Sequence, residues 1–152
     1  MDGDSQQPLT LKVINALYVE AMVLADEARA YFDEHSHGAR ERMAPLARVT
    51  FSCESLKVTA RLMHVIAWLL TRRAMAEGGC AAGSERGGDR LGTAAESDPD
   101  GLAALPIEAR QLIESSMGLY RRVARLETGL ARPRQDQSPA RRLQARLMAN
   151  IG

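Results

Sequence analysis

The stretch from Glu54 to Gly78 contains no proline and no glycine before its last residue, so nothing in it interrupts a helix. With its lead-in from Pro45, it places apolar residues at alternating steps of four and three, which predicts one apolar seam along a long helix. The seam, which we expect to be buried, contains Val49, Cys53, Leu56, Ala60, Met63, Ala67, Leu70 and Ala74. A second apolar row lies on another side of the same helix and contains Val58, Leu62, Val65 and Leu69, with Ile66 and Trp68 close by. A helix that is apolar on two sides is central in its bundle or also faces a second copy of the chain.

A first amphipathic helix precedes the central one. It is predicted to begin near Thr10 and has apolar residues at steps of three and four as far as Tyr31. Gly38 can take the left-handed conformation that closes a helix, so we expect the first helix to end there. The central helix should begin near Ala44, because Pro45 suits a first helical turn.

A third helix is predicted from Pro106 to about Gly129, after a glycine-rich segment with almost nothing apolar to bury. No stretch alternates apolar and polar residues as a strand would. We therefore expect an all-α fold, an antiparallel three-helix bundle that runs up, down and up, with a long flexible linker between helices two and three and a mobile C-terminal tail. The expected division is a flexible N-terminus (1–9), the bundle domain (10–129), the linker inside it (78–104) and a basic flexible tail (130–152).

The size and composition of the chain indicate one soluble domain. Its 152 residues suffice for a single core, and its scarce aromatics and abundant alanine, leucine and arginine favour helix. The N-terminus is acidic and polar, unlike a signal peptide, and no span reaches the roughly 18 uncharged apolar residues of a membrane helix. Two cysteines, Cys53 and Cys80, suggest reduced thiols. We expect a cytoplasmic protein with no membrane partner.

Residues that carry chemistry do not cluster in the sequence. The histidines and cysteines form no CxxC pair and no histidine pair at helical spacing, and His35 and His37 near a helix end are better explained as solvated side chains. Cys53 lies on the apolar seam and Cys80 has no neighbouring base, so neither is an activated nucleophile. Phosphate-binding and nucleophile-elbow motifs are absent. The sequence predicts a non-enzymatic protein with no catalytic, cofactor-binding or metal-binding residues and no small-molecule substrate.

Two groups of residues are the candidates for packing and for binding. The predicted core of the bundle or of a dimer consists of Leu56, Leu62, Met63, Ile66, Trp68, Leu69, Leu70, Leu112, Leu119 and Val123. Trp68 could instead anchor an interface, since tryptophan and arginine are frequent in interface hot spots. The candidate partner surface consists of Arg61, Arg72, Arg73, Arg121, Arg122, Arg125, Arg141 and Arg142, of which the first three could simply be the solvated face of the central helix.

The end of the chain is strongly basic. From Leu119 onward it has eight arginines against two acidic residues, Glu127 and Asp136. Such a tail can bind phosphate backbones without sequence specificity, so a small nucleic-acid-associated regulatory protein is the alternative function. The tail could equally be a solubilising segment or dock on acidic protein surfaces. No pair of helices with a tight turn predicts a recognition helix, so nucleic acid is the less favoured partner.

The central and third helices together resemble a known family. The residues that carry the resemblance are Glu54-Ser55, Thr59, Arg61-Leu62-Met63, Trp68-Leu69-Leu70, Arg73-Ala74 and Gly78, then Leu105-Pro106, Leu112-Ile113, Ser116, Leu119-Tyr120, Arg122-Val123 and Arg125-Leu126. They are similar to the RcdA-like family of alphaproteobacterial proteins, formerly described as a domain of unknown function and named for regulating the degradation of the cell-cycle regulator CtrA. The chain departs from that family at Gly78-Gly79, where the family has Gly-Glu, and in its glycine-rich linker.

The resemblance implies a function that the residues alone do not. It implies a homodimeric three-helix bundle without catalytic residues that acts as an adaptor in proteolysis and cell-cycle regulation. The partners it implies are the AAA+ protease ClpXP with its priming factors on one side and cargo proteins on the other, with the flexible tail contributing to contact.

Overall fold

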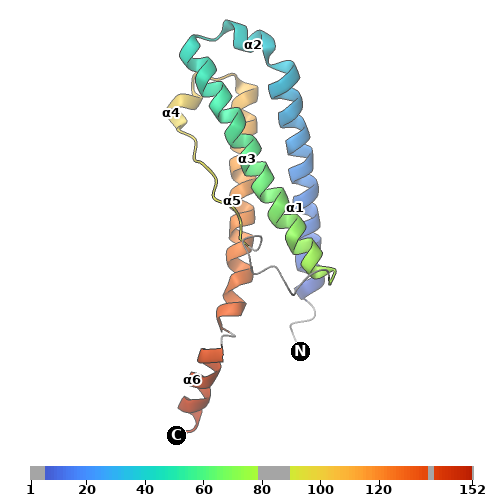
Figure 1. Ribbon diagram of the computed structural model, residues 1–152, viewed down its shortest axis with the longest axis vertical. Helices are drawn as coiled ribbons and strands as arrows, with labels where there is room; N and C mark the ends of the chain where they lie inside the picture. Colours follow the sequence, from blue (N-terminus) through green and yellow to red (C-terminus); the bar gives the residue numbers. More distant parts are fainter. Residues whose placement is uncertain (1–5, 79–89, 137–138, 152) are drawn as a thin grey trace.

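Three long helices form the body of the protein in the computed structural model (Figure 1). The structure describes residues 6–78, 90–136 and 139–151. Its elements are α1 (Gln6–Arg29), the short π-helix η1 (Ala30–His35), α2 (His37–Arg42), α3 (Pro45–Ala76), α4 (Pro99–Leu102), α5 (Ile107–Asp136) and α6 (Pro139–Ala149). The described residues contain no strand, which confirms the all-α prediction, with α1, α3 and α5 packed together.

The direction of α5 differs from the prediction. α3 runs antiparallel to α1, as expected, with Phe32 beside Phe51 at ring centroids 5.3 Å apart. α5 instead runs parallel to α3: residues 90–98 return along the bundle before α5 begins (Figure 1). The starts of the two helices therefore lie together, where Ala47 and Pro106 line one pocket. The up-down-up topology is therefore wrong. The linker has room for this return, because α3 is about 48 Å long and about 15 extended residues span that distance.

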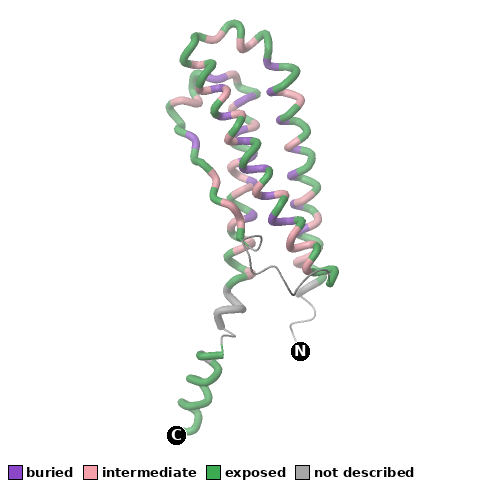
Figure 2. The backbone as a smooth tube through the Cα atoms, in the orientation of Figure 1, coloured by how far each residue is buried: buried purple, intermediate pink, exposed green. Residues whose placement is uncertain are grey.

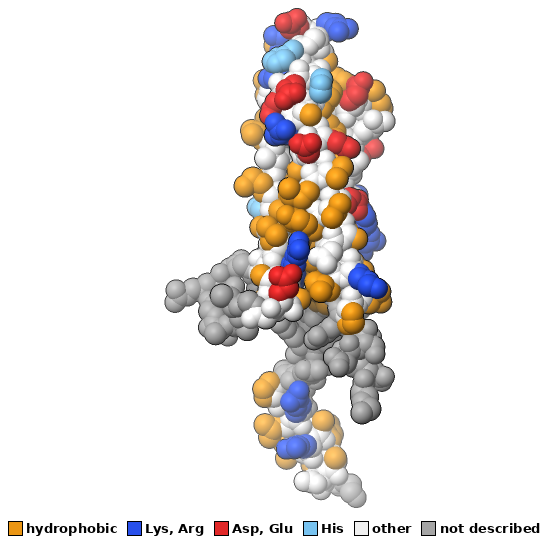
Figure 3. Space-filling model, turned by 90° about the vertical axis from the view of Figure 1, so that its right-hand side faces the viewer, with side chains coloured by type: hydrophobic (Ala, Val, Ile, Leu, Met, Phe, Trp, Pro, Cys, Tyr) orange, Lys and Arg blue, Asp and Glu red, His pale blue; other side chains and the backbone are white. Residues whose placement is uncertain are grey.

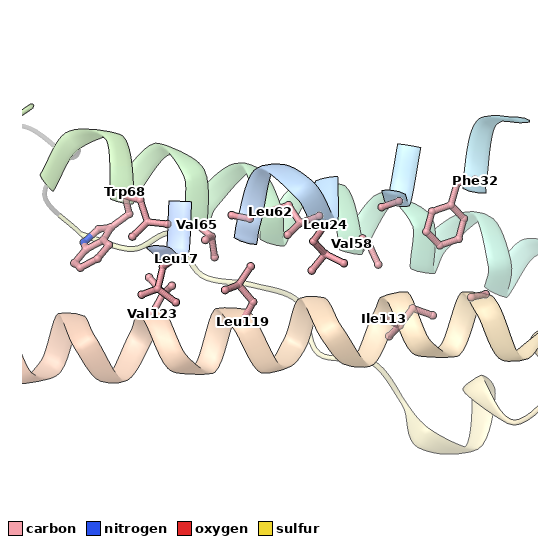
Figure 4. Packing of buried hydrophobic residues seen from close by; sticks show 14 of the residues in the cluster. Leu17, Leu24, Phe32, Val58, Leu62, Val65, Trp68, Ile113, Leu119 and Val123 are labelled. Carbon is pink, nitrogen blue, oxygen red and sulfur yellow. The ribbon is translucent and has the colours of Figure 1, made fainter. Parts of the chain in front are cut away.

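The core lies where the three long helices meet, and α3 contributes its second apolar row to it (Figures 2 and 4). Leu62, Trp68, Leu69, Leu119 and Val123 of the predicted core are buried, while Ile66 and Leu112 are half-buried against it. The other buried apolar side chains are Ile14, Leu17, Ala21, Leu24, Ala28, Phe32, Phe51, Val58, Val65, Leu105, Ala109 and Ile113.

The first apolar seam of α3 points away from this core. Leu56 is 70% exposed, Met63 64% and Leu70 44%, and Val49 and Cys53 are exposed as well. The expectation that this seam is buried is wrong for the single chain, so Leu56, Met63 and Leu70 are not part of the bundle core. Periodicity identifies both rows, but it does not say which of them the other helices cover.

The ends of the helices agree with the sequence in part. α3 begins at Pro45, preceded by the extended Ala44, and it is followed by Gly78 with a φ of 79°, as predicted. Gly38 does not close the first helix, because the chain turns through η1 directly into α2. α5 passes Gly129 without ending and continues to Asp136. α6 then forms a helix in the predicted flexible tail.

The predicted flexible linker is ordered in its second half. Residues 79–89 lie outside the described part of the chain, whereas residues 90–98, which we call the strap, lie along α3 and α5. α4 follows the strap, and the Asp98 carboxylate caps it by accepting a hydrogen bond from the backbone N–H of Asp100 at 3.0 Å. The division into N-terminus, bundle domain and tail remains a prediction.

α1 is apolar beyond its buried face. One span, Pro8–His35, is long and apolar enough to cross a membrane by length and composition alone, although seven charged side chains from Lys12 to Glu34 keep it from being uncharged. A single such helix is weak support for a membrane protein, because helices that pack in soluble bundles pass the same test. Here one face of α1 packs against α3 and α5, but only 17% of the apolar window is buried by this packing.

Candidate functional site

Arg61 is buried and holds the strap in place. Only 1% of it is exposed, and its guanidinium donates to the Ala95 carbonyl at 2.9 Å and to the Ser97 hydroxyl at 2.6 Å. The same group donates to the Ser116 hydroxyl on α5 at 3.2 Å. Arg61 therefore joins α3, α5 and the strap. Its prediction as part of the partner surface is wrong, because its head points into the gap between these three elements.

Glu54 supplies the negative charge beside Arg61. Its buried carboxylate accepts hydrogen bonds from the Ser97 hydroxyl and, at 2.9 Å, from the ammonium of Lys57, which also donates to the Glu96 carbonyl at 3.0 Å. Burial lowers the pKa of Arg61 from its ordinary value, and the Glu54 charge partly offsets this effect. We call Glu54, Arg61, Ser97 and Ser116 the polar cluster. Because every member has a partner, the cluster fixes the strap at a defined register.

A second group of contacts holds the other end of the strap. The Tyr120 hydroxyl donates to the Gly92 carbonyl at 2.6 Å, and the backbone N–H of Leu91 donates to the Glu127 carboxylate. Gly92 also lies against the imidazole of His64: a Cβ on Gly92 would be 2.7 Å from the His64 Nδ1. Only glycine fits between the strap and α3 at this point, so the strap is held by polar contacts and one close backbone approach.

Gly92→Ala is expected to lift the strap from α3 and to lower the free energy of unfolding by about 1–3 kcal/mol, because the new methyl overlaps the His64 ring. Urea unfolding followed by circular dichroism measures the change. His64→Ala in the same chain should recover most of the loss by removing the ring. Gly118→Ala is a control in which nothing lies within 4 Å of the new Cβ; because Gly118 is inside α5, we expect alanine there to keep or raise the stability. An equal loss in Gly92→Ala and the double variant would contradict this account.

The other predicted arginines lie in three settings. Arg72 stacks on the Trp68 ring at 5.0 Å and Arg73 on the Tyr18 ring at 5.7 Å, both measured to the ring centroid. Arg122 forms an ion pair with Glu20 of α1 that is exposed by nearly half and lowers the pKa of Glu20 through its hydrogen bond. Arg121, Arg125 and Arg142 are exposed as well. The side chain of Arg141 lies outside the described residues.

A group of exposed apolar side chains lies over α1 and α3. Figure 3 shows hydrophobic side chains gathered in the middle of this face, with charged side chains toward its upper end. Those on α1 include Val19 at 60% exposure and Met22 at 45%, beside the outward seam of α3. Sequence reasoning listed the α3 seam but missed the α1 residues, because it counted only the buried stripe of α1. Scattered exposed apolar residues are ordinary, but a contiguous group marks a surface for a partner.

A groove opens between α1 and α3 on this face. Its volume is about 370 Å³, and small side chains on α1, Ala25 and Ala28, leave the space. Leu56 and Met63 form the α3 wall, and Arg29 carries the charge at the rim together with an aspartate. The remaining lining residues are Phe32, Asp33, Ser55, Thr59, Leu62 and Ile66. An apolar groove of this form suits an apolar side-chain stripe of another helix.

Metal-ligating side chains do not gather in the described part of the chain. No group of three or more histidine, cysteine or acidic side chains there could hold a metal ion. His35 and His37 are exposed near the end of η1, and Cys53 is exposed on α3 in place of the buried position that the seam predicted. Cys80 lies outside the described residues.

Comparison with known proteins adds a family to this geometry. No curated protein matches the chain. The crystal structure of RcdA from Caulobacter crescentus CB15 is similar, with 27% sequence identity and a TM-score of 0.62, over 76% of this chain and 88% of that one. The resemblance seen in the sequence is thereby confirmed. A family model described as a protein of unknown function, DUF1465, matches residues 5–151, and the chain belongs to that family.

Proposed function

We propose that this chain is a cytoplasmic, non-enzymatic adaptor that helps to deliver cell-cycle regulatory proteins to the ClpXP protease. The observation that carries the proposal is the likeness to RcdA in both sequence and structure. RcdA-like proteins act as adaptors in that pathway. An adaptor works by raising the local concentration of cargo at the protease, which requires binding surfaces and no chemistry.

The surfaces of the chain are compatible with this role. The face over α1 and α3 offers exposed apolar side chains, which suit a protein partner better than a nucleic acid. Arg73 lies close to it, over the Tyr18 ring of α1, whereas Arg72 stacks on Trp68. The exposed Arg121, Arg125 and Arg142 lie on α5 and α6. We assign partner contact to these arginines in place of the larger predicted set, from which the buried Arg61 is removed.

A homodimer is the second part of the proposal. The outward seam of α3 repeats apolar residues at steps of four and three, the pattern of helices that pair with another helix. Within the single chain this seam is exposed, with Met63 and Leu70 near its middle. Pairing of two seams would remove it from water. The second row of α3 cannot supply this dimer contact, because it is already buried in the bundle.

A degradation assay tests the adaptor role. Purified ClpXP with its priming factors and several candidate cargo proteins would be incubated with and without this chain, and cargo loss followed by gel. A faster loss of at least one cargo supports the proposal. Unchanged rates across all cargo proteins, with protease activity verified on an adaptor-independent substrate, would rule it out.

A further inference from the structure

The outward seam of α3 alternates bulky and small side chains. Its bulky members are Leu56, Met63 and Leu70, and its small members are Ala60, Ala67 and Ala74. All six are exposed, and all lie on one continuous helix. Each set repeats every seven residues, so a helix that packs on this seam meets raised layers and flat layers in turn. A partner fits this seam closely only if it is bulky where α3 is flat and flat where α3 is bulky.

A second copy of the seam meets this requirement in one direction only. A closed dimer of identical chains has a twofold axis. If this axis runs along the two α3 helices, they are parallel and each residue lies beside its own copy. The parallel pair then stacks bulky side chains on each other, which holds the helices apart and leaves the alanine layers unfilled. Unfilled space of this kind forfeits van der Waals contact.

If the twofold axis runs across the helices, they are antiparallel, and one register pairs every bulky residue with an alanine. The axis then lies level with Val65, midway along the six residues of the seam. Counted outward from that level, the layers are Met63 with the partner's Ala67, Leu70 with the partner's Ala60, and Leu56 with the partner's Ala74. Every layer contains one bulky and one small side chain, so the two helices approach evenly along the whole seam.

The charges at the two ends of this face favour the same direction. Asp33 is exposed and lines the groove together with Leu56. Arg73 lies over the Tyr18 ring of α1 and precedes Ala74 in the sequence. A parallel pair would bring each of these charges level with its own copy, whereas the antiparallel pair brings Arg73 level with Asp33 of the partner subunit. Opposite charges placed in this way orient two chains more than they add affinity.

We propose that two copies of the chain pair through their α3 seams in the antiparallel direction, with the twofold axis level with Val65. This inference rests on the proposed homodimer and gives it a direction and a register. The bulky side chains of each seam fill the space over the alanines of the other. The α1 helices of the two subunits lie on the same side of the pair, so the α1 part of the exposed face remains open to another partner.

Disulfide trapping in the full-length chain tests the direction and the register. In a background with Cys53→Ser and Cys80→Ser, one chain has Leu56→Cys and a second, heavier by a tag, has Ala74→Cys. After subunit exchange and mild oxidation, we expect a linked pair of one heavy and one light chain. Each of the two chains oxidised alone is the matched control. In the proposed pair its two identical positions lie about 27 Å apart, beyond the reach of a disulfide, so we expect at least tenfold less product.

Ala67→Leu in the chain without introduced cysteines gives a second measurement, whose sign depends on the direction. Against Met63 of the partner subunit, the added bulk overpacks two layers, so we expect the dissociation constant of the dimer to rise about tenfold. In a parallel pair the two new leucines would fill an alanine layer and tighten the dimer. Ala67 is exposed in the single chain, so the subunit keeps its fold, which circular dichroism verifies. An unchanged or lower dissociation constant would overturn the proposal.

Sedimentation of the cysteine-free background separates the possible failures. A monomer overturns both the homodimer and its register. A dimer in which the matched controls link as well as the mixed pair, or in place of it, overturns the antiparallel direction and leaves the homodimer standing. A dimer that links in neither case shows that the copies meet through another face, which also overturns the inference. The degradation assay reports on adaptor function independently of these outcomes.

Discussion

Leu69→Asp is expected to leave the chain largely unfolded at room temperature. Leu69 is completely buried between the three long helices, so the substitution removes its packing and places a carboxylate in an apolar core. Truncation to alanine at such a site costs about 2–5 kcal/mol, and an unpaired buried charge costs more. Total stabilities are about 5–15 kcal/mol, so little folded protein would remain. Circular dichroism at 222 nm and urea unfolding measure the loss.

The neighbouring position provides the control. Leu70 is 44% exposed on the outward seam of α3, so Leu70→Asp adds the same charge to the same helix without entering the core. We expect the Leu70 variant to stay folded, with an unfolding free energy within about 1 kcal/mol of the wild type for the isolated subunit. If the two variants lost equal stability, the assignment of the two rows of α3 to core and surface would be wrong.

Arg61→Met is expected to free the strap and to destabilise the chain by about 3 kcal/mol. Methionine fills the space of the alkyl chain, but it removes the nearby positive charge that favours the buried Glu54 carboxylate and leaves the Ala95 carbonyl without its donor. The ion pair between Lys57 and Glu54 remains. The expected loss of stability is therefore at the lower end of the range for removing one charge from a buried pair. Hydrogen exchange of residues 91–98 should become markedly faster, and urea unfolding measures the loss of stability.

A second substitution separates charge from packing in this prediction. Arg61→Met combined with Glu54→Met removes both charges, so the double variant should recover a large part of the lost stability. Exchange in the strap should remain fast, because the Arg61 hydrogen bonds to Ala95 and Ser97 are still missing. Slow exchange in either variant would show that Arg61 does not hold the strap.

Much of α3 could be predicted from the sequence because its signals are local. Pro45 and Gly78 act on the backbone beside them, and both limits of the helix agree with the structure. The end of α5 could not be predicted in this way. Gly129 costs a helix only about 1 kcal/mol relative to alanine, so it does not by itself end one.

The direction of α5 and the place of the strap depend on contacts distant in sequence. The sequence nevertheless contains one signal of the buried polar cluster. Glu54 and Arg61 are seven residues apart, and they share a helix face with Val58 and Val65 of the buried row. Two opposite charges on an apolar stripe indicate a buried pair that needs polar partners. Ser97 and Ser116 are those partners, but their positions follow only from the tertiary fold.

The spacing of the apolar residues in the candidate surface could be predicted, but the position of this surface on the bundle could not. The outward seam was recognised from its spacing, yet its exposure depends on where α1 and α5 pack. The groove was not predictable, because it arises where Ala25 and Ala28 of α1 meet Leu56 and Met63 of α3. Binding surfaces of this kind are properties of two elements together.

The central claim is that this chain delivers cargo to ClpXP through the exposed face over α1 and α3. The measurement that tests it most directly is the initial rate of cargo degradation by primed ClpXP with no added chain, with the wild type and with Val19→Asp, whose side chain on the α1 part of this face is 60% exposed and lies outside the α3 seam. We predict a wild-type rate about tenfold above the rate without the chain, and a variant that is folded but loses most of this gain. Equal rates for wild type and no added chain would contradict the adaptor role, and equal rates for wild type and folded variant would contradict the assigned surface.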